Sequence, residues 1–154
     1  MSTHLFLLMM LLLIARDACA TGCLVDPDGS GHVAIPTDWN SIPQEAFQAC
    51  ANLTSVTIPK NIETIGERAF HGCTALTILT FADSDTSLLT TIGKGAFFTT
   101  RITSLVIPPS VVTIDSQAFY VCTSLTNLAF GSSSTTALSH LAIIGEDAFY
   151  KAPI

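Results

Sequence analysis

Charged side chains, and basic ones above all, are scarce in this sequence. Charged residues make up 12% of its 154 residues, with six Lys or Arg against twelve Asp or Glu, and the formal net charge is −6. Nucleic-acid binding needs basic patches that neutralise phosphates, and acidic membrane surfaces attract positive charge in the same way. The composition therefore argues against a nucleic-acid partner and against binding to an acidic membrane surface.

Signatures of catalysis and of cofactor binding are missing as well. The sequence contains no Gly-x-Ser-x-Gly turn, no His-Glu-x-x-His zinc motif and no phosphate-binding glycine loop. After residue 20 the histidines are His32, His71 and His140, and the sequence pattern places no nucleophile or carboxylate with them. We predict a protein that is not an enzyme and that needs no cofactor.

Long apolar runs are absent except near the start of the chain. Residues 5–14 form a ten-residue apolar run, which is too short to span a bilayer but has the length of a signal-peptide core. Small residues at positions 18–20 offer a cleavage site, although no Lys or Arg precedes the run. We predict a signal peptide over residues 1–20, no membrane span, and a secreted or cell-surface product. A lipid anchor on Cys23 is the alternative.

What the sequence does contain is a repeat. An Ile, a short polar step and an Ala-Phe pair return together five times, and the Phe-to-Phe steps are 23, 27, 22 and 30 residues, a period typical of solenoids. Each copy opens with a short alternating apolar segment, which predicts a short strand with one buried face. Single coils cannot bury their own apolar faces, so the copies must stack. The repeated residues expected to form the stacked core are Ile42, Phe47, Cys50, Ile65, Phe70, Cys73, Ile92, Phe97, Ile114, Phe119, Cys122, Ile144 and Phe149.

The order Ile-Pro, Ile-Gly, Ala-Phe-x-x-Cys-x-x-Leu closely resembles the BspA-like type of leucine-rich repeat. The copy from Ile58-Pro59 to Leu76 carries every one of these positions, including Ile65-Gly66 and Ala69-Phe70. The resemblance covers roughly residues 32 to 154. It implies a repeat protein of the cell surface or the secreted fraction, of a kind linked to attachment to host matrix or to other cells.

We predict an α/β repeat solenoid of the leucine-rich-repeat kind, a right-handed stack of about five coils. Each coil is expected to contain short β-strands and one short helical turn at the Ala-Phe segment. The predicted organisation is a signal peptide in 1–20, a Gly-rich turn or cap in 21–31 and repeats in 32–154. The coils are expected at 32–53, 54–76, 77–102, 103–125 and 126–154, the last of them incomplete.

Four cysteines would remain after cleavage, in an oxidising compartment: Cys23, Cys50, Cys73 and Cys122. The last three share one position of the repeat, where packed thiols behave as small apolar side chains. Stacked coils bring equivalent atoms to about 5 Å, so a disulfide from Cys50 to Cys73 or from Cys23 to Cys50 is also possible. One Cys per coil lacks the paired ligand spacing of a zinc site.

Residues 26–33 match the first eight positions of a calcium-binding EF-hand loop, and Asp26, Asp28 and Ser30 would supply its ligands. The match then fails, because Thr37 stands where the bidentate Glu is required. A polar Gly-rich turn is the favoured interpretation, and we expect no bound metal.

Two columns of exposed residues emerge when the coils are aligned. The threonine column consists of Thr54, Thr77, Thr103 and Thr126, with Thr57 and Thr80 on the adjacent strands. The aromatic column follows the repeated Phe and consists of Phe98, Tyr120 and Tyr150, after Gln48 and His71. Exposed aromatic residues often anchor protein interfaces, but Thr also suits strands, and an aromatic ring beside a core Phe can simply cover it.

These observations favour a non-catalytic interaction module that binds an extracellular or cell-surface protein or glycan, with adhesion as one such role. The alternatives are binding to an ordered surface such as ice or mineral through the threonine column, and a structural part of a wall or matrix. Self-association through the uncapped C-terminal coil is a further expectation. Asn52 begins an Asn-Leu-Thr sequon and is a glycosylation candidate.

Overall fold

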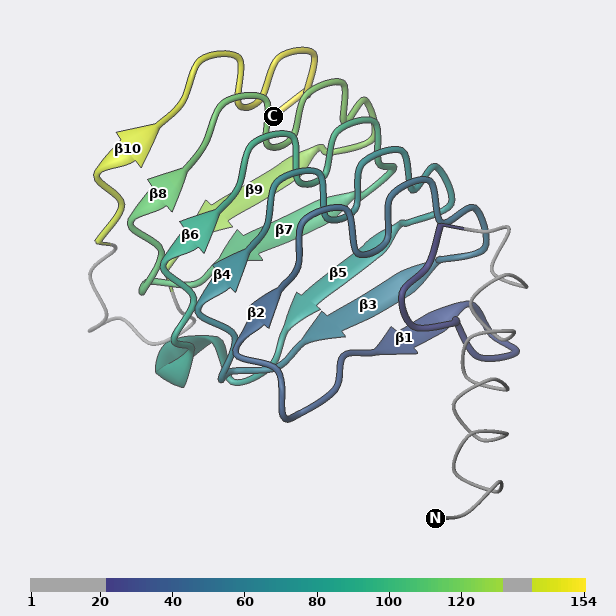
Figure 1. Ribbon diagram of the computed structural model, residues 1–154. Helices are drawn as coiled ribbons and strands as arrows, with labels where there is room; N and C mark the ends of the chain where they lie inside the picture. Colours follow the sequence, from purple (N-terminus) through teal and green to yellow (C-terminus); the bar gives the residue numbers. More distant parts are fainter. Residues whose placement is uncertain (1–21, 132–139) are drawn as a thin grey trace, which may run out of the picture.

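The computed structural model describes residues 22–131 and 140–154, which form a β-solenoid (Figure 1). The predicted signal peptide therefore lies outside the described residues. Successive coils stack side by side, and the chain completes about four turns between its first and its last long strand. Within the described residues, no helix has the length and the apolar character needed to cross a membrane.

Each coil contributes one strand to each of two sides of the solenoid. The long-strand side contains β1 (His32–Ala34), β3 (Ser55–Ile58), β5 (Ile78–Phe81), β7 (Ser104–Ile107) and β9 (Asn127–Phe130). The short-strand side contains β2 (Ser41–Ile42), β4 (Thr64–Ile65), β6 (Thr91–Ile92), β8 (Thr113–Ile114) and β10 (Ile143–Ile144). All hydrogen-bonded neighbours are parallel, and the short strands form one continuous five-stranded sheet.

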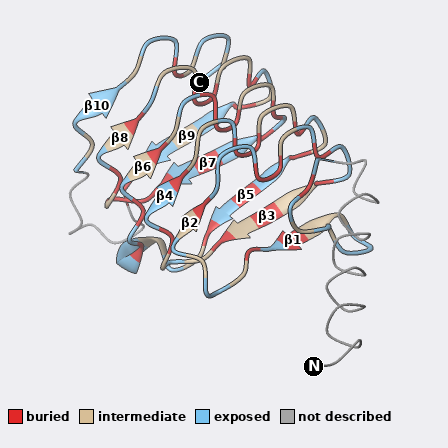
Figure 2. Cartoon of the chain, in the orientation of Figure 1, coloured by how far each residue is buried: buried red, intermediate tan, exposed pale blue. Residues whose placement is uncertain are grey.

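The alternation of apolar and polar residues sets which side chains face inward. In β3, Val56 and Ile58 are buried, and the pairing places Val56 beside Leu79 of β5 and Ile58 beside Phe81. Equivalent positions of neighbouring coils therefore meet in register, and the buried apolar residues of one strand meet apolar residues of the next. Figure 2 shows buried residues recurring along both sets of strands.

The expected helical turn at each Ala-Phe segment is absent, so the α/β class and the helical turn per coil were wrong. These segments are successive tight turns, and the only helix in the described residues is a short 3-10 helix, η1 (Ser84–Thr86). The cause is a left-handed residue just before the Ala and another two positions after the Phe, as at Glu45 (φ 59°) and Ala49 (φ 57°). Right-handed helices cannot contain such residues.

Backbone hydrogen bonds in these turns run to the neighbouring coil instead of along a helix. The Phe47 N–H donates to the carbonyl of Ala69 over 2.7 Å, and the Ala49 N–H donates to the carbonyl of His71 over 2.7 Å. The N–H groups that alternate with these donate to the carbonyl three residues earlier in the same turn. The Cys50 N–H, for example, donates to the carbonyl of Phe47. This wall of turns therefore links the coils almost as a sheet does.

A stack of phenylalanine rings runs through the core. Phe47, Phe70, Phe97, Phe119 and Phe149 follow one another with ring centroids 5.0–5.2 Å apart and ring planes within 6° of parallel. The first four rings are fully buried, whereas Phe149 is only partly covered. Ile144, also expected in the core, is 54% exposed, because no described coil packs on the far side of β10.

The N-terminal end of the stack is closed by residues 22–31. A disulfide joins Cys23 to Cys50, with their Cα atoms 5.2 Å apart, and it is one of the two disulfides that the sequence left open. The Leu24 N–H donates to the carbonyl of Ala46 over 2.6 Å, and Trp39 packs against the core from the same end. Among the other cysteines within residues 22–131 and 140–154, the thiols of Cys73 and Cys122 are free and buried.

Candidate functional site

Three of the four hydroxyl groups of the threonine column donate to backbone carbonyls of the preceding coil or cap. The Thr77 hydroxyl donates to the carbonyl of Thr54 over 3.3 Å, and the Thr126 hydroxyl donates to the carbonyl of Thr103 over 3.4 Å. The Thr54 hydroxyl donates to the carbonyl of Ser30 in the N-terminal cap over 3.0 Å. Thr54, Thr77 and Thr126 therefore help to hold their coils on the preceding part of the chain, and a binding role for the column stays a prediction.

The aromatic column is a second ladder of stacked rings, on the surface beside the core phenylalanines. His71, Phe98, Tyr120 and Tyr150 stack with centroids 4.6–4.9 Å apart, and the Lys151 ammonium lies 5.4 Å from the Tyr150 centroid. Each inner ring thus has both faces covered by its neighbours. Sugar rings bind aromatic side chains through their faces, so this column offers a glycan mostly ring edges.

His71 stands at one end of this column, and its Nδ1 atom is buried without a hydrogen-bond partner. Burial lowers the pKa of His71 below its ordinary value of 6.5, and the nearby Arg68 guanidinium lowers it further. The folded protein therefore keeps a neutral imidazole at a pH where the unfolded chain binds a proton.

From this shift we predict that acid weakens the fold partly through His71. The free energy of unfolding should fall as the pH drops below 6.5, because the unfolded His71 is protonated first. In a His71→Gln variant, which copies Gln48 of the preceding coil, this part of the pH dependence should vanish. Urea unfolding from pH 7.5 to pH 5 would measure it, and identical pH profiles for the two proteins would contradict the assignment.

The calcium-like segment forms a local polar turn. The Asp28 Oδ1 atom accepts hydrogen bonds from the backbone N–H groups of Ser30 and His32 and from the Ser30 hydroxyl, at 2.6–3.0 Å. The hydroxyl bond is the main reason that the pKa of Asp28 lies below its usual value. Among the described residues, no group of three or more His, Cys, Asp or Glu side chains is arranged to hold a metal ion.

Asn52, the glycosylation candidate, is exposed in the turn before β3.

A break in the long-strand side is the feature that the sequence did not predict. The long strands form two sheets, β1-β3-β5 and β7-β9, although β5 and β7 are neighbours (Figure 1). The Thr103 N–H lies 3.4 Å from the Thr77 carbonyl, whereas the equivalent bond from Thr126 to Thr103 is 3.1 Å. At the other end of β7, Pro108 has no N–H to donate to the coil before it, unlike Gly131, which donates to Ile107.

The coil that precedes the break differs from the coil before it in two ways. It ends its long strand in Phe81, where the coil before it has Ile58-Pro59, and it then carries η1 in a longer turn. The residue before η1, Asp83, has a left-handed backbone (φ 47°), and its carboxylate lies 3.8 Å from the Lys60 ammonium. The long-strand side is therefore interrupted next to the coil that has a longer turn after β5 and has Phe81 in place of Ile58.

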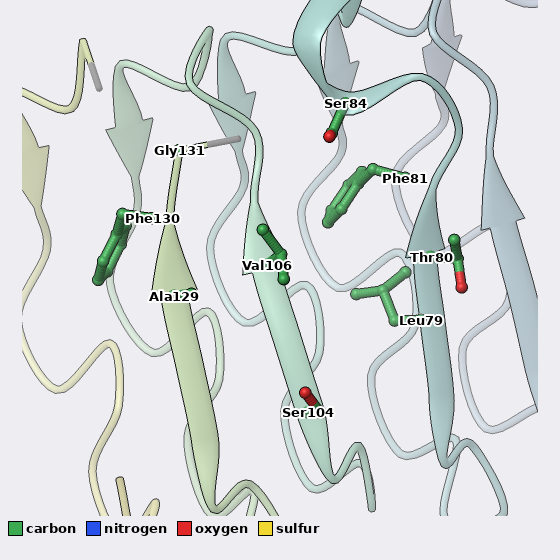
Figure 3. Close-up of a pocket in the computed structure, with 9 residues that line it drawn as sticks. All are labelled: Leu79, Thr80, Phe81, Ser84, Ser104, Val106, Ala129, Phe130 and Gly131. Atoms are coloured by element: carbon green, nitrogen blue, oxygen red, sulfur yellow. The ribbon is translucent and has the colours of Figure 1, made fainter. Parts of the chain in front are cut away.

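A groove of about 490 Å³ lies over this break (Figure 3). Its apolar surface comes from three strands, and hydroxyl groups stand at its edges. In Figure 3, Leu79 and Phe81 extend from β5 toward β7, and Val106 lies over β7. The residues that line the groove are Leu79, Thr80, Phe81, Ser84, Ser104, Val106, Ala129, Phe130 and Gly131.

An acidic hollow adjoins the groove at η1. Asp83 and Asp85 line it together with Phe81 and Ser84, which also line the groove. Of the threonines singled out from the sequence, only Thr80 borders the groove, and the aromatic column does not reach it. Sequence reasoning missed Val106 and Ala129 as site residues, and the signal that could have pointed to them is the longer turn after Phe81.

Solved structures of bacterial leucine-rich repeat proteins resemble this fold. The pneumococcal vaccine antigen PcpA shares 25% identity and a TM-score of 0.52 over 64% of this chain and 28% of its own. A leucine-rich repeat protein from Eubacterium ventriosum shares 17% identity and a TM-score of 0.52 over 80% of this chain and 43% of its own. A leucine-rich cell surface protein from Faecalibacterium prausnitzii shares 22% identity and a TM-score of 0.42, over 78% of this chain and 44% of its own.

This chain thus spans less than half the length of each of these three proteins. No curated protein matches its sequence at a significant level. The BspA-type leucine-rich repeat region, by contrast, matches residues 40–154 in six copies, which confirms the resemblance drawn from the Ile-Gly and Ala-Phe motifs. The chain belongs to the BspA-type leucine-rich repeat family.

Proposed function

We propose that this chain is a secreted or cell-surface interaction module that binds an extracellular protein in the groove over the β5–β7 break and catalyses no reaction. The observation that carries the proposal is the groove itself, in which apolar side chains of β7 and β9 are open to solvent beside the largely buried Leu79 and Phe81 of β5, together with a few hydroxyl groups. Concave apolar sites with a few polar groups are the usual form of a binding site. Adhesion to a host or to another cell is one role that such a module would serve.

An extracellular location is supported by two features of the chain. The disulfide between Cys23 and Cys50 belongs to an oxidising compartment, and residues 1–20 have the pattern of a signal peptide. The similar pneumococcal protein is described as a vaccine antigen, which agrees with exposure outside the cell.

The groove also indicates the chemistry of the partner. Val106 and Phe130 offer exposed apolar contacts in the groove, and the adjoining hollow carries the carboxylates of Asp83 and Asp85. An extended protein segment with an apolar side chain next to Lys or Arg complements both parts. The hydroxyl groups of Thr80 and Ser104, which line the same groove, can form hydrogen bonds with the backbone of that segment.

A protein is favoured over the other partners that the sequence left open. Glycan binding by the aromatic column is disfavoured because neighbouring rings cover its faces. Binding to an ice or mineral surface needs an unbroken regular array, and the long-strand side is interrupted between β5 and β7. A structural role in a wall or matrix would use none of the groove residues.

The test uses two valines of one coil as a matched pair. Val106 lines the groove and is 46% exposed, whereas Val112 lies outside it and is 38% exposed. A Val106→Lys variant should bind the partner at least about tenfold more weakly, since about 1.4 kcal/mol of lost apolar contact corresponds to that factor. Val112→Lys should bind as the parent does. Pull-down from extracellular extracts, followed by titration of the captured protein, measures both.

A third variant separates the groove from the threonine column. Changing Thr54, Thr77, Thr103 and Thr126 to Lys leaves the groove lining intact. If this variant loses the partner while Val106→Lys keeps it, the site lies on the threonine column and the groove assignment fails. Circular dichroism of each variant checks that the fold is unchanged.

A further inference from the structure

Two core side chains of β5 can be reached from outside through the groove. Leu79 is 6% exposed and Phe81 is 9% exposed, and both belong to the hydrophobic core as well as to the lining of the groove. The residues at the same two positions of the coils on either side are only 1% exposed: Val56, Ile58, Leu105 and Ile107. The floor of the groove is therefore a part of the core that the neighbouring coils keep covered.

The two coils that meet at the break separate on the long-strand side and stay joined elsewhere. On the short-strand side β6 pairs with β8, and in the wall of turns the Phe97 N–H donates to the carbonyl of Ala118 over 2.7 Å. On the long-strand side β5 and β7 are not paired, although β3 pairs with β5 and β7 with β9 over four residues each. The opening between these coils is therefore a wedge, joined along two sides and open on the third.

The floor of this wedge favours a ligand group of a particular size and polarity. Leu79 and Phe81 lie two residues apart on β5, which is about 6.6 Å along a strand. A side chain of the size of Leu, Met or Phe can contact both of them, whereas Ala or Ser is too short. A charged side chain would lose its hydration over an apolar floor. The wedge therefore suits a single large apolar side chain (Figure 3).

We propose that the partner inserts one large apolar side chain between β5 and β7, against Leu79 and Phe81, and that this side chain decides which partners bind. The inference rests on the proposed function, in which the groove is the binding site. Asp83 and Asp85 line the hollow at the Phe81 end of the floor. The Lys or Arg of the same segment therefore lies on that side of the inserted residue.

Peptides provide the probe for this inference. Random seven-residue peptides displayed on phage are selected on the folded chain, and those that use the groove are identified by their loss of binding to Val106→Lys. The selected sequences should share one Leu, Met or Phe beside a Lys or Arg. Replacing that apolar residue by Ala should weaken binding at least about tenfold, since it removes a fully buried side chain. An Ala outside this pair of residues should change the affinity less than about threefold.

A diazirine analogue of leucine at the apolar position of the peptide reports where that side chain lies. Irradiation should attach it to Leu79 or Phe81, as identified by mass spectrometry of the digested product. Attachment to Thr80, Val106 or Ala129 alone would place the side chain on the outer face, and the inference would be wrong although the groove still binds. Attachment outside the groove, or the failure to select any peptide that depends on Val106, would overturn both the inference and the proposed function.

Two leucines at one position of the repeat provide a matched pair of variants. Leu79→Val copies Val56 of the preceding coil and removes one methylene from the floor, whereas Leu105→Val makes the same change outside the groove lining. Leu79→Val should weaken binding of the selected peptide about fourfold, the factor that corresponds to one buried methylene. Leu105→Val should leave the affinity unchanged. Equal effects of the two variants would contradict insertion, because the peptide would then respond to the core in general and not to the floor of the groove.

Discussion

A Phe97→Ala variant should have a free energy of unfolding about 3–5 kcal/mol lower than the parent. Phe97 is fully buried and stacks between Phe70 and Phe119, at 5.1 Å from each ring. Both neighbours are held by backbone hydrogen bonds between coils, so they cannot move in to fill the cavity. Urea unfolding followed by circular dichroism measures the loss, and in a solenoid it should appear as weaker coupling between the two halves of the stack.

The adjacent residue provides the control for this prediction. Phe98 is also stacked between two rings, but it belongs to the aromatic column and is partly exposed. Phe98→Ala should cost less than half as much as Phe97→Ala, because water can enter the space that is left. Equal losses would mean that the surface ladder supports the fold as strongly as the core does, contrary to the burial of the two rings.

The second large effect is expected from the disulfide. Replacing Cys23 by Ala should lower the free energy of unfolding by about 3–4 kcal/mol, the chain-entropy value for a loop closed over the 27-residue separation between the two cysteines. The loss of stability should be concentrated in the first coil. The disulfide ties the cap to this coil, whose Phe47 ring is the first of the core stack. Urea unfolding and hydrogen exchange of residues 22–53 provide the two readouts.

Reductant distinguishes this disulfide from the other cysteines. It should destabilise the parent and leave the Cys23→Ala variant unchanged, and an equal effect on both proteins would contradict the assignment.

Burial raises the pKa of the Cys73 thiol to about 12 and raises that of Cys122 as well. Their thiols donate to the carbonyls of Phe47 and Phe97. Alkylation at pH 8 should therefore reach them only after unfolding.

Most of the stacking order could be predicted from the sequence because it follows from periodicity alone. Residues that recur at one position, such as Ile65 and Phe70, must meet their equivalents when the coils stack, whatever the local backbone does. The repeat also indicated that the coils have two strand segments each. The repeated Ile and Phe side chains are accordingly buried in all but the last coil.

The helical turn was mispredicted because its apolar spacing is truly helical. Ile65, Ala69 and Cys73 follow one another at four-residue steps, which is the signal of a helix face. The left-handed residues that prevent a helix are of many types, for example Glu45 and Val121. Left-handed conformation is readable from a sequence mainly when Gly or Asn occupies the position, so this turn leaves no reliable trace.

The groove could not be predicted because it depends on how an insertion is accommodated. The sequence indicates a longer turn after Phe81 and the loss of the Ile-Pro ending. Whether such an insertion bulges outward or separates two strands depends on packing around Phe81 and Val106, which only the three-dimensional structure contains. The threonine column, conversely, was conspicuous in the sequence because its hydroxyls serve the backbone in coil after coil.

Site-specific photo-crosslinking tests the proposed binding site most directly. A photoreactive residue placed at Val106, and separately at Val112, would be activated while the chain is mixed with extracellular extract. The account predicts one crosslinked protein from position 106, attached through a segment with an apolar residue beside Lys or Arg, and no crosslink to that protein from position 112. Two results would contradict the proposed site. One is that the captured protein is crosslinked from position 112 and not from position 106. The other is that position 106 gives no crosslinked protein although the folded chain still captures a partner.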